Sequence, residues 1–126
     1  LAKQEMLDIL NEKFENKIIN FHPSLLPSFK GLNAIDQALE QNAFLLGNTA
    51  HFINEKPDSG LVIMQSIIHS SRYKTYDNVL DLQIPMLIQI MRWIKMDRLS
   101  ITDEKVTVQN ADYSVGPFMP KLEIEP

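Results

Sequence analysis

An asparagine and a histidine stand two positions apart at the end of an apolar run, just before a proline-rich loop. The run KIINF, residues 17–21, contains Asn20, and His22 precedes PSLLPSFKG at residues 23–31. Side chains two apart in a strand point to the same side, so this amide and imidazole would face one point. An amide N–H can stabilise a developing oxyanion, and imidazole can donate or move a proton near neutral pH. The pair suits chemistry at a carbonyl carbon, although an Asn–x–His pair can also simply stabilise a turn.

A second pair with the same spacing lies in GNTAHFINEKPDSG, residues 47–60. Thr49 and His51 stand two apart on a predicted strand, and Asp58 follows in a loop bounded by proline and glycine. A carboxylate in that loop could accept or relay a proton, or orient an imidazole. The same residues also fit a solvated turn in which the aspartate makes an Asx-type hydrogen bond. Spacing alone leaves both interpretations open.

Composition excludes several classes of function. The 126 residues are 44% hydrophobic and 22% charged, with a net charge of −4, which argues against a general nucleic-acid binder with a basic face. No apolar run approaches the roughly 20 residues that cross a bilayer, so we expect no membrane association. Cysteine is absent, and the three histidines lack metal-ligand spacing, so we predict no disulfide and no metal site. These features fit a globular protein of the cytoplasm.

Helical and strand patterns alternate along the chain. The predicted helices cover residues 3–15, 33–42 and 76–96. The predicted strands cover residues 17–21, 44–54 and 61–70, with a hairpin at 99–108. We expect Asn33 to be an N-cap and Pro85 to kink or divide the longest helix. The pattern predicts an α/β fold with an open, mostly parallel sheet flanked by helices, and a site outside the carboxyl ends of the strands.

Taken together, two stretches resemble the folate-dependent formyltransferase family. They are INFHPSLLPSFKGLNAIDQAL at residues 19–39 and LGNTAHFINEKPDSGLVIMQ at residues 46–65. The family pattern is N-x-H-P-S-L-L-P, a K/R-G, a helix, G-x-T-x-H-F and a D-x-G loop, and all stand here in that order. The likeness runs from about Met6 to about Leu99. It implies a portion of a formyltransferase-like catalytic domain over residues 1–110 and an extended tail over 111–126.

The resemblance implies an enzyme that transfers a formyl group from 10-formyltetrahydrofolate to a primary amine. Asn20 and protonated His22 would stabilise the oxyanion, while Asp58 would hold His22 and help to move the proton. Thr49 and His51 would support that arrangement from the neighbouring strand. A loop would wrap the pteridine of the folate, largely through backbone groups, and its residues are Asn54, Glu55, Lys56, Pro57, Asp58, Ser59 and Gly60.

One departure from the family pattern concerns the extent of the fold. The amino-terminal half of the family fold, with its first strands and a glycine-rich phosphate loop, is missing from this sequence. We therefore expect part of a larger sheet, with an edge that should be covered. The sequence also leaves open a homodimer through that edge, and a chain that is inactive by itself.

A second departure concerns the acceptor. The likeness is strongest to members that formylate glycinamide ribonucleotide, but Gln83 stands where those carry a glutamate that contacts the substrate. An amide can bond a hydroxyl but cannot pair with a cationic amine, so a nucleotide-linked amino sugar is the alternative acceptor. The related deformylases usually have a histidine at the position of Pro23, which argues against hydrolysis. A non-catalytic folate- or protein-binding module is the alternative from another class.

Overall fold

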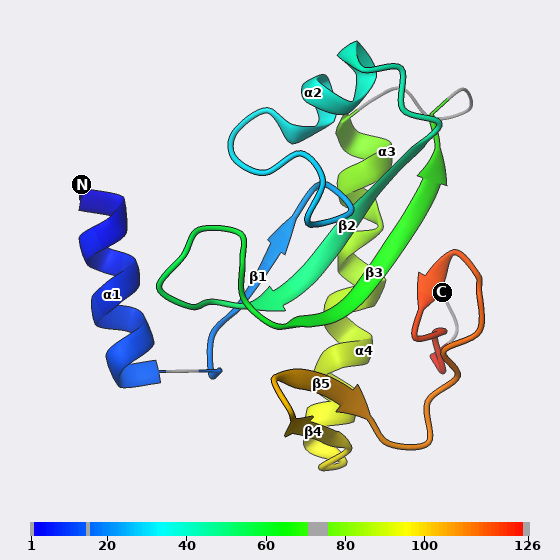
Figure 1. Ribbon diagram of the computed structural model, residues 1–126. Coiled ribbons are helices and arrows are strands. Elements are labelled where there is room, and N and C mark those ends of the chain that lie inside the picture. The colour runs from blue at the N-terminus through cyan, green and yellow to red at the C-terminus, as the bar shows by residue number, and fades with distance from the viewer. Residues whose placement is uncertain (1, 15, 71–75, 125–126) are drawn as a thin grey trace.

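The computed structural model describes residues 2–14, 16–70 and 76–124 (Figure 1). The strands are β1 (Ile19–His22), β2 (Leu45–Phe52), β3 (Val62–His69), β4 (Leu99–Thr102), β5 (Lys105–Val108) and β6 (Phe118–Met119). The helices are α1 (Ala2–Phe14), α2 (Ala34–Glu40), α3 (Tyr76–Asp81) and α4 (Gln83–Lys95). Within these residues β1, β2, β3 and β6 form one sheet in that order, and β4 and β5 form a separate ribbon.

The strands of the described sheet run in alternating directions. All three neighbouring pairs are antiparallel, so the α/β class is confirmed but the expectation of a mostly parallel sheet is wrong. A parallel pair needs a crossover of a dozen or more residues, and only the short loop of residues 53–61 joins β2 to β3. Between β1 and β2 the chain passes through α2, which lies beyond one end of the sheet rather than along its face (Figure 1).

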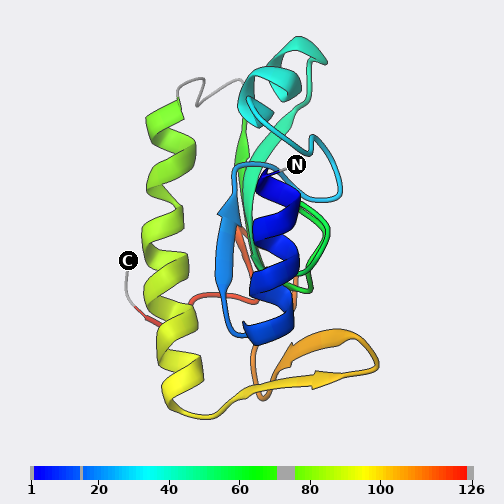
Figure 2. The ribbon, with the colours of Figure 1, turned by 90° about the vertical axis from the view of Figure 1, so that its left-hand side faces the viewer.

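Helices cover the two faces of the sheet differently. α3 and α4 run along one face, and α1 lies on the opposite side (Figure 2). On α4 the buried residues Met86, Ile90 and Trp93 recur at spacings of four and three, as expected for a helix with one face on a core. The buried members of that core are Ala50, Phe52, Ile63, Met64, Met86, Ile90, Trp93 and Val108.

The predicted helices are confirmed, with differences at their ends. Residue 15, the predicted end of the first helix, lies outside the described residues. The long helix divides at Leu82, just before Pro85, because proline has no N–H to bond the carbonyl one turn earlier. Asn33 is the N-cap residue of α2, as expected, but its backbone is left-handed, with φ of 58°, and its side chain makes no cap hydrogen bond. Side-chain capping needs an extended backbone at that position.

The predicted strands are also confirmed, although the first begins later than expected and includes His22. The hairpin turns at Asp103 and Glu104, both with positive φ, as the tight turn between two twisted strands requires. The segment expected as an extended tail contributes β6, which pairs with β3 and covers its edge. The proposed division into residues 1–110 and 111–126 stays a prediction.

Candidate functional site

The register of the central strands gathers the polar residues singled out in the sequence. Asn20 lies opposite His51, and His22 lies opposite Thr49. Thr49 in turn lies opposite Gln65 on β3. Directly opposed residues of antiparallel strands project to the same face. We call this face, formed by these five residues and turned away from α3 and α4, the polar face.

His51 is buried, and its ring sets the orientation of the Asn20 amide. Its Nδ1 atom lies 3.0 Å from the carbonyl oxygen of Phe52, which can only accept, so Nδ1 carries the proton. The Nε2 atom is therefore an acceptor, and Nδ2 of Asn20 donates to it at 3.3 Å. Burial lowers the pKa of His51 below its usual value, which favours the neutral ring that this arrangement needs.

His22 is held between a carboxylate and a backbone carbonyl. Its Nδ1 atom lies 3.4 Å from Oδ1 of Asp58, and the two side chains are 7% and 12% exposed. Its Nε2 atom donates to the carbonyl oxygen of Phe29 at 2.8 Å. The second carboxylate oxygen of Asp58 accepts the N–H of Gly31 at 2.9 Å. The loop after β1 therefore fixes both partners of the pair.

The loop of residues 54–60 closes on itself around the Asn54 side chain. Its amide donates to the carbonyl of Ser59 at 3.1 Å, and its oxygen accepts the N–H of Lys56 at 2.9 Å. Gly60 follows where the chain passes against Phe52: a Cβ there would lie 1.5 Å from the Phe52 carbonyl oxygen. Close approach of two backbones thus explains the glycine of the D-x-G pattern.

A cavity of about 240 Å³ lies over the polar face, between α1 and the loop of residues 54–60. The residues that line it are Lys3, Met6, Leu7, Asn20, His51, Ile53, Asn54, Lys56, Pro57 and Asp58. It therefore brings together Asn20, His51 and Asp58 of the predicted site. His22 lies behind Asp58 and is not among the lining residues. A larger, more polar basin of about 790 Å³ adjoins at Asn54 and Lys56.

Two of the predicted site residues, Thr49 and Gln83, do not line this cavity. Thr49 is fully buried beneath the loop that follows His22, and its hydroxyl donates to the carbonyl of Ser24 at 2.7 Å. Gln83 donates to Oδ1 of Asn48 at 2.9 Å. The Asn48 side chain also donates to the Val79 carbonyl, so it lies on the face covered by α3. Gln83 is thus not brought to the polar face, and its contact with substrate stays a prediction.

Sequence reasoning missed Gln65, a partly buried amide within the mostly apolar strand VIMQSIIH. A lone amide in such a run is the signal that could have identified it, because buried polar groups need partners. It also missed the contact between the two loops, in which Nζ of Lys30 donates to Oγ of Ser59 at 3.1 Å.

Among the described residues, no group of three or more histidine, aspartate or glutamate side chains could hold a metal ion. The helices of residues 2–14, 34–40, 76–81 and 83–95 are too short or too polar to span a bilayer.

This arrangement is that of a known class of proteins. The family model described as formyl transferase matches residues 7–83, well over half of the chain. The chain belongs to the formyl transferase family, which confirms the resemblance read from the sequence.

Individual relatives agree with this assignment. The chain is 30% identical over 114 residues to phosphoribosylglycinamide formyltransferase of Haemophilus influenzae, covering 87% of this chain and 51% of that protein. It is 41% identical over 68 residues to formyltetrahydrofolate deformylase of Escherichia coli K12, and this match covers 54% of this chain and 24% of that protein. Its structure matches that of phosphoribosylglycinamide formyltransferase from Anaplasma phagocytophilum with a TM-score of 0.76 and 31% sequence identity. This match covers 82% of this chain and 53% of that protein. The chain thus spans about half the length, or less, of the relatives it matches.

Proposed function

We propose that the natural polypeptide carrying this sequence transfers a formyl group from 10-formyltetrahydrofolate to a primary amine. The favoured acceptor is glycinamide ribonucleotide, in line with the names of the Haemophilus and Anaplasma relatives. One observation carries the proposal: the amide of Asn20, oriented by His51, and the carboxylate of Asp58, paired with His22, open on the same cavity.

The reaction places charge on the formyl oxygen when the amine nitrogen attacks the formyl carbon. Asn20 uses one N–H on His51, which leaves its second N–H to donate to that oxygen. His22 can add a second donor once its Nε2–H turns from the Phe29 carbonyl toward the substrate. Asp58 lines the cavity and contacts His22, so this pair can receive the proton that the amine loses.

The lining of the 240 Å³ cavity suits a flat aromatic ring. Met6, Leu7 and Pro57 supply apolar surface, and the loop of residues 54–60 offers backbone groups along one side. A ligand site commonly combines such apolar lining with a few placed polar groups. The pteridine of the folate would occupy this cavity and place its formyl group near Asn20. The rest of the folate would extend into the polar basin next to Lys56.

A nucleotide-linked amino sugar is the second candidate acceptor, because Gln83 is neutral. Its amide already donates to Asn48, and an amide cannot form an ion pair with an ammonium group. We propose that Gln83 contacts a hydroxyl of the acceptor remote from the reacting amine, because its amide lies on the face of β2 opposite Asn20.

The test incubates the natural polypeptide with 10-formyltetrahydrofolate and each acceptor in turn, and measures formylated product. We expect product with glycinamide ribonucleotide. Product with the amino sugar alone would change the acceptor, and formate released without any amine would indicate hydrolysis. If no reaction consumes the formyl donor, the enzyme proposal fails and the folate-binding module is favoured.

The His22→Ala variant tests the catalytic assignment within that assay. We expect the rate per folded molecule to fall about 10²–10⁴-fold, the usual contribution of a positioned proton donor, with the fold retained. His69→Ala is the matched control, since it removes a histidine at the far end of β3. Equal rates in the two variants would remove His22 from the proposed mechanism.

A further inference from the structure

We propose that Gln65 is a positioning residue, whose side-chain amide fixes the loop that holds His22 and Asp58. We call residues 23–31 the His22 loop. The inference rests on the proposed function for its catalytic consequence, but its structural claim can be tested separately. Gln65 contacts neither the 240 Å³ cavity nor His22 directly, so it would act through the loop.

The hydroxyl of Thr49 uses every hydrogen bond available to it. It donates to the carbonyl of Ser24 at 2.7 Å and accepts the N–H of Leu26 at 3.0 Å. It also accepts one N–H of the Gln65 amide at 2.9 Å. A hydroxyl has one donor and two acceptor sites, so Thr49 is saturated. Two of its three partners belong to the backbone of the His22 loop.

The amide of Gln65 completes this set of bonds. Its Nε2 atom also donates to the carbonyl oxygen of Leu26 at 3.2 Å, so both amide hydrogens are engaged. The N–H and the carbonyl of Leu26 are therefore both held, one by Thr49 and the other by Gln65. Because β3 pairs with β2 at Gln65 and Thr49, the sheet presents both side chains in a fixed row with His22.

The His22 loop transmits this anchoring to the reacting groups. The Phe29 carbonyl accepts the Nε2–H of His22, and the Gly31 N–H donates to Asp58. Both groups lie within five residues of Leu26, on a segment that is also held by the Gln37 amide, which donates to the Lys30 carbonyl, and by the bond from Lys30 to Ser59. A shift of the Leu26 backbone would therefore move the acceptor of the imidazole and the donor to the carboxylate together.

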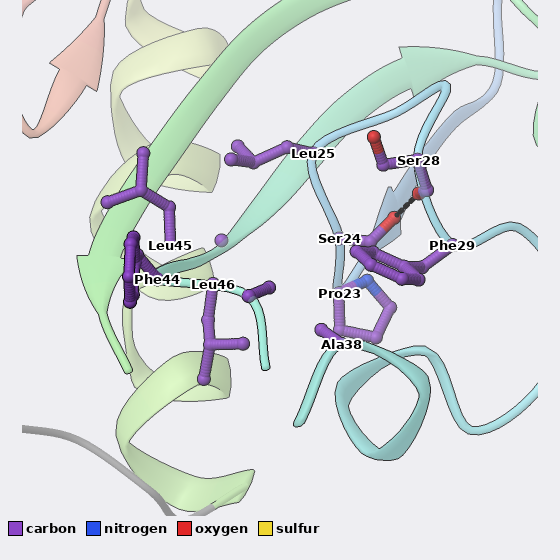
Figure 3. Close-up of a pocket in the computed structure, with 11 residues that line it drawn as sticks. Pro23, Ser24, Leu25, Ser28, Phe29, Ala38, Phe44, Leu45 and Leu46 are labelled. Atoms are coloured by element: carbon purple, nitrogen blue, oxygen red, sulfur yellow. Dashed lines mark hydrogen bonds between the residues drawn. The ribbon is translucent and has the colours of Figure 1, made fainter. Parts of the chain in front are cut away.

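Apolar packing does not secure this loop on every side. Figure 3 shows Pro23, Leu25 and Phe29 around a cavity of about 270 Å³ that also borders α2 and the start of β2. These three side chains are only partly buried. The Ser24 hydroxyl donates to the Ser28 carbonyl at 2.5 Å, which holds the loop to itself but not to the sheet (Figure 3). The Leu26 side chain is itself buried, and the bonds from Thr49 and Gln65 attach its backbone to the sheet.

The experiment compares two substitutions that remove a side-chain amide with little change of shape. Gln65→Met removes the donors to Leu26 and Thr49. Gln89→Met is the matched control: Gln89 is buried on α4, and its oxygen accepts the N–H groups of Glu123 and Ile124, far from the His22 loop. Both changes leave buried backbone or hydroxyl groups short of a partner, so both should reduce stability.

Two measurements separate positioning from stability. Formyl transfer should show kcat of Gln65→Met lowered about tenfold to hundredfold, as misplacement by about an ångström can do, with KM for 10-formyltetrahydrofolate nearly unchanged. Nitrogen-15 NMR of the imidazole rings, assigned with His22→Ala, should show the His22 resonances displaced in Gln65→Met. Neither effect is expected in Gln89→Met. If Gln65→Met does not fold, Gln65→Asn keeps a neutral amide but withdraws it by one methylene.

The outcomes separate the two proposals. Unchanged His22 resonances in a folded Gln65 variant would overturn the positioning role, whatever the activity. Displaced resonances with no formyl transfer by the unsubstituted protein would uphold the role and refute the proposed function. A loss of kcat that is equal in Gln65→Met and Gln89→Met would assign the effect to stability and overturn the inference.

Discussion

The two faces of β2 are equally buried but are held by different forces. Asn48 and Ala50 face α3 and α4, while Thr49 and His51 face the His22 loop and the cavity. Ala50 belongs to the core that contains Trp93, where contact is apolar and without direction. Thr49 is held by three hydrogen bonds, each with a fixed direction. The comparison indicates that one face mainly supplies stability and the other mainly supplies geometry.

This contrast follows from the physics of the two kinds of contact. Apolar burial stabilises in proportion to the area removed from water and tolerates small displacements. Buried polar groups contribute modestly when paired and are costly when a partner is lost. Substitutions on the helix side should therefore lower the free energy of unfolding, whereas substitutions on the polar face should first change the rate of reaction.

The largest expected effect is that of Asp58→Asn on the rate. The asparagine oxygen can still accept the Gly31 N–H, so the loop contact is kept while the charge beside His22 is lost. We expect formyl transfer to fall about 10²–10⁴-fold, as for loss of a general acid–base group, with unfolding changed only slightly. Asp112→Asn, at an exposed and distant aspartate, is the control. A rate for Asp58→Asn close to that of the control would contradict the role of the carboxylate.

The converse effect is expected from Trp93→Ala on the helix side. Trp93 is 0% exposed, and its removal should lower the free energy of unfolding by about 3–5 kcal/mol, as is typical for a large core side chain. Urea unfolding measures this, with Lys95→Ala on the exposed side of the same helix as control. The rate per folded molecule should stay unchanged. A Trp93 variant that is stable but slow would break the division between the two faces.

The features of the two faces that depend on local sequence could be predicted. The i, i+2 spacing of Asn20 with His22, and of Thr49 with His51, placed each pair on one side of a strand. The spacing of Met86, Ile90 and Trp93 is a local pattern of the same kind. The family pattern then singled out Asp58, whose loop position alone fitted an ordinary turn equally well.

The parts that depend on the path of the chain could not be predicted. The direction of β1 relative to β2 is decided by how the chain returns through α2, which the strands themselves do not encode. The antiparallel direction of β3 relative to β2, by contrast, follows from the short loop of residues 53–61, whose length the sequence shows. β6 has only two residues, and its place in the sheet depends on pairing with Gln65 and Ser66 of β3, which are far away in sequence. The role of Gln65 required the return path of the His22 loop, because Leu26 lies 39 positions away in sequence.

A smaller effect is expected from Thr49→Val, which sharpens the contrast within β2 itself. Valine keeps the shape but leaves the Leu26 N–H and one Gln65 N–H without their acceptor. An unsatisfied buried donor typically costs about 1–3 kcal/mol, so the free energy of unfolding should fall by that order. Thr49→Ser restores the hydroxyl and should recover most of the loss. If Thr49→Val is as stable as the unsubstituted protein, the hydrogen bonds of this face do not hold the loop.

The smallest effect is a pH dependence that belongs to His51. Burial lowers the pKa of its ring in the folded protein, more than the nearby carboxylate of Asp58 raises it, while the unfolded chain titrates near 6.5. Below about pH 6.5 the unfolded state therefore binds more protons than the folded state, and the free energy of unfolding falls as pH decreases. The slope from this one group is at most about 1.4 kcal/mol per pH unit. His51→Gln keeps a donor and an acceptor but cannot titrate. Its free energy of unfolding, measured between pH 5 and 7.5, should therefore change less steeply with pH. His69→Gln is the control and should leave the slope contributed by His51 intact. Equal slopes in the unsubstituted protein and His51→Gln would mean that the ring is protonated alike in both states, and that a neutral His51 is not what orients the amide of Asn20.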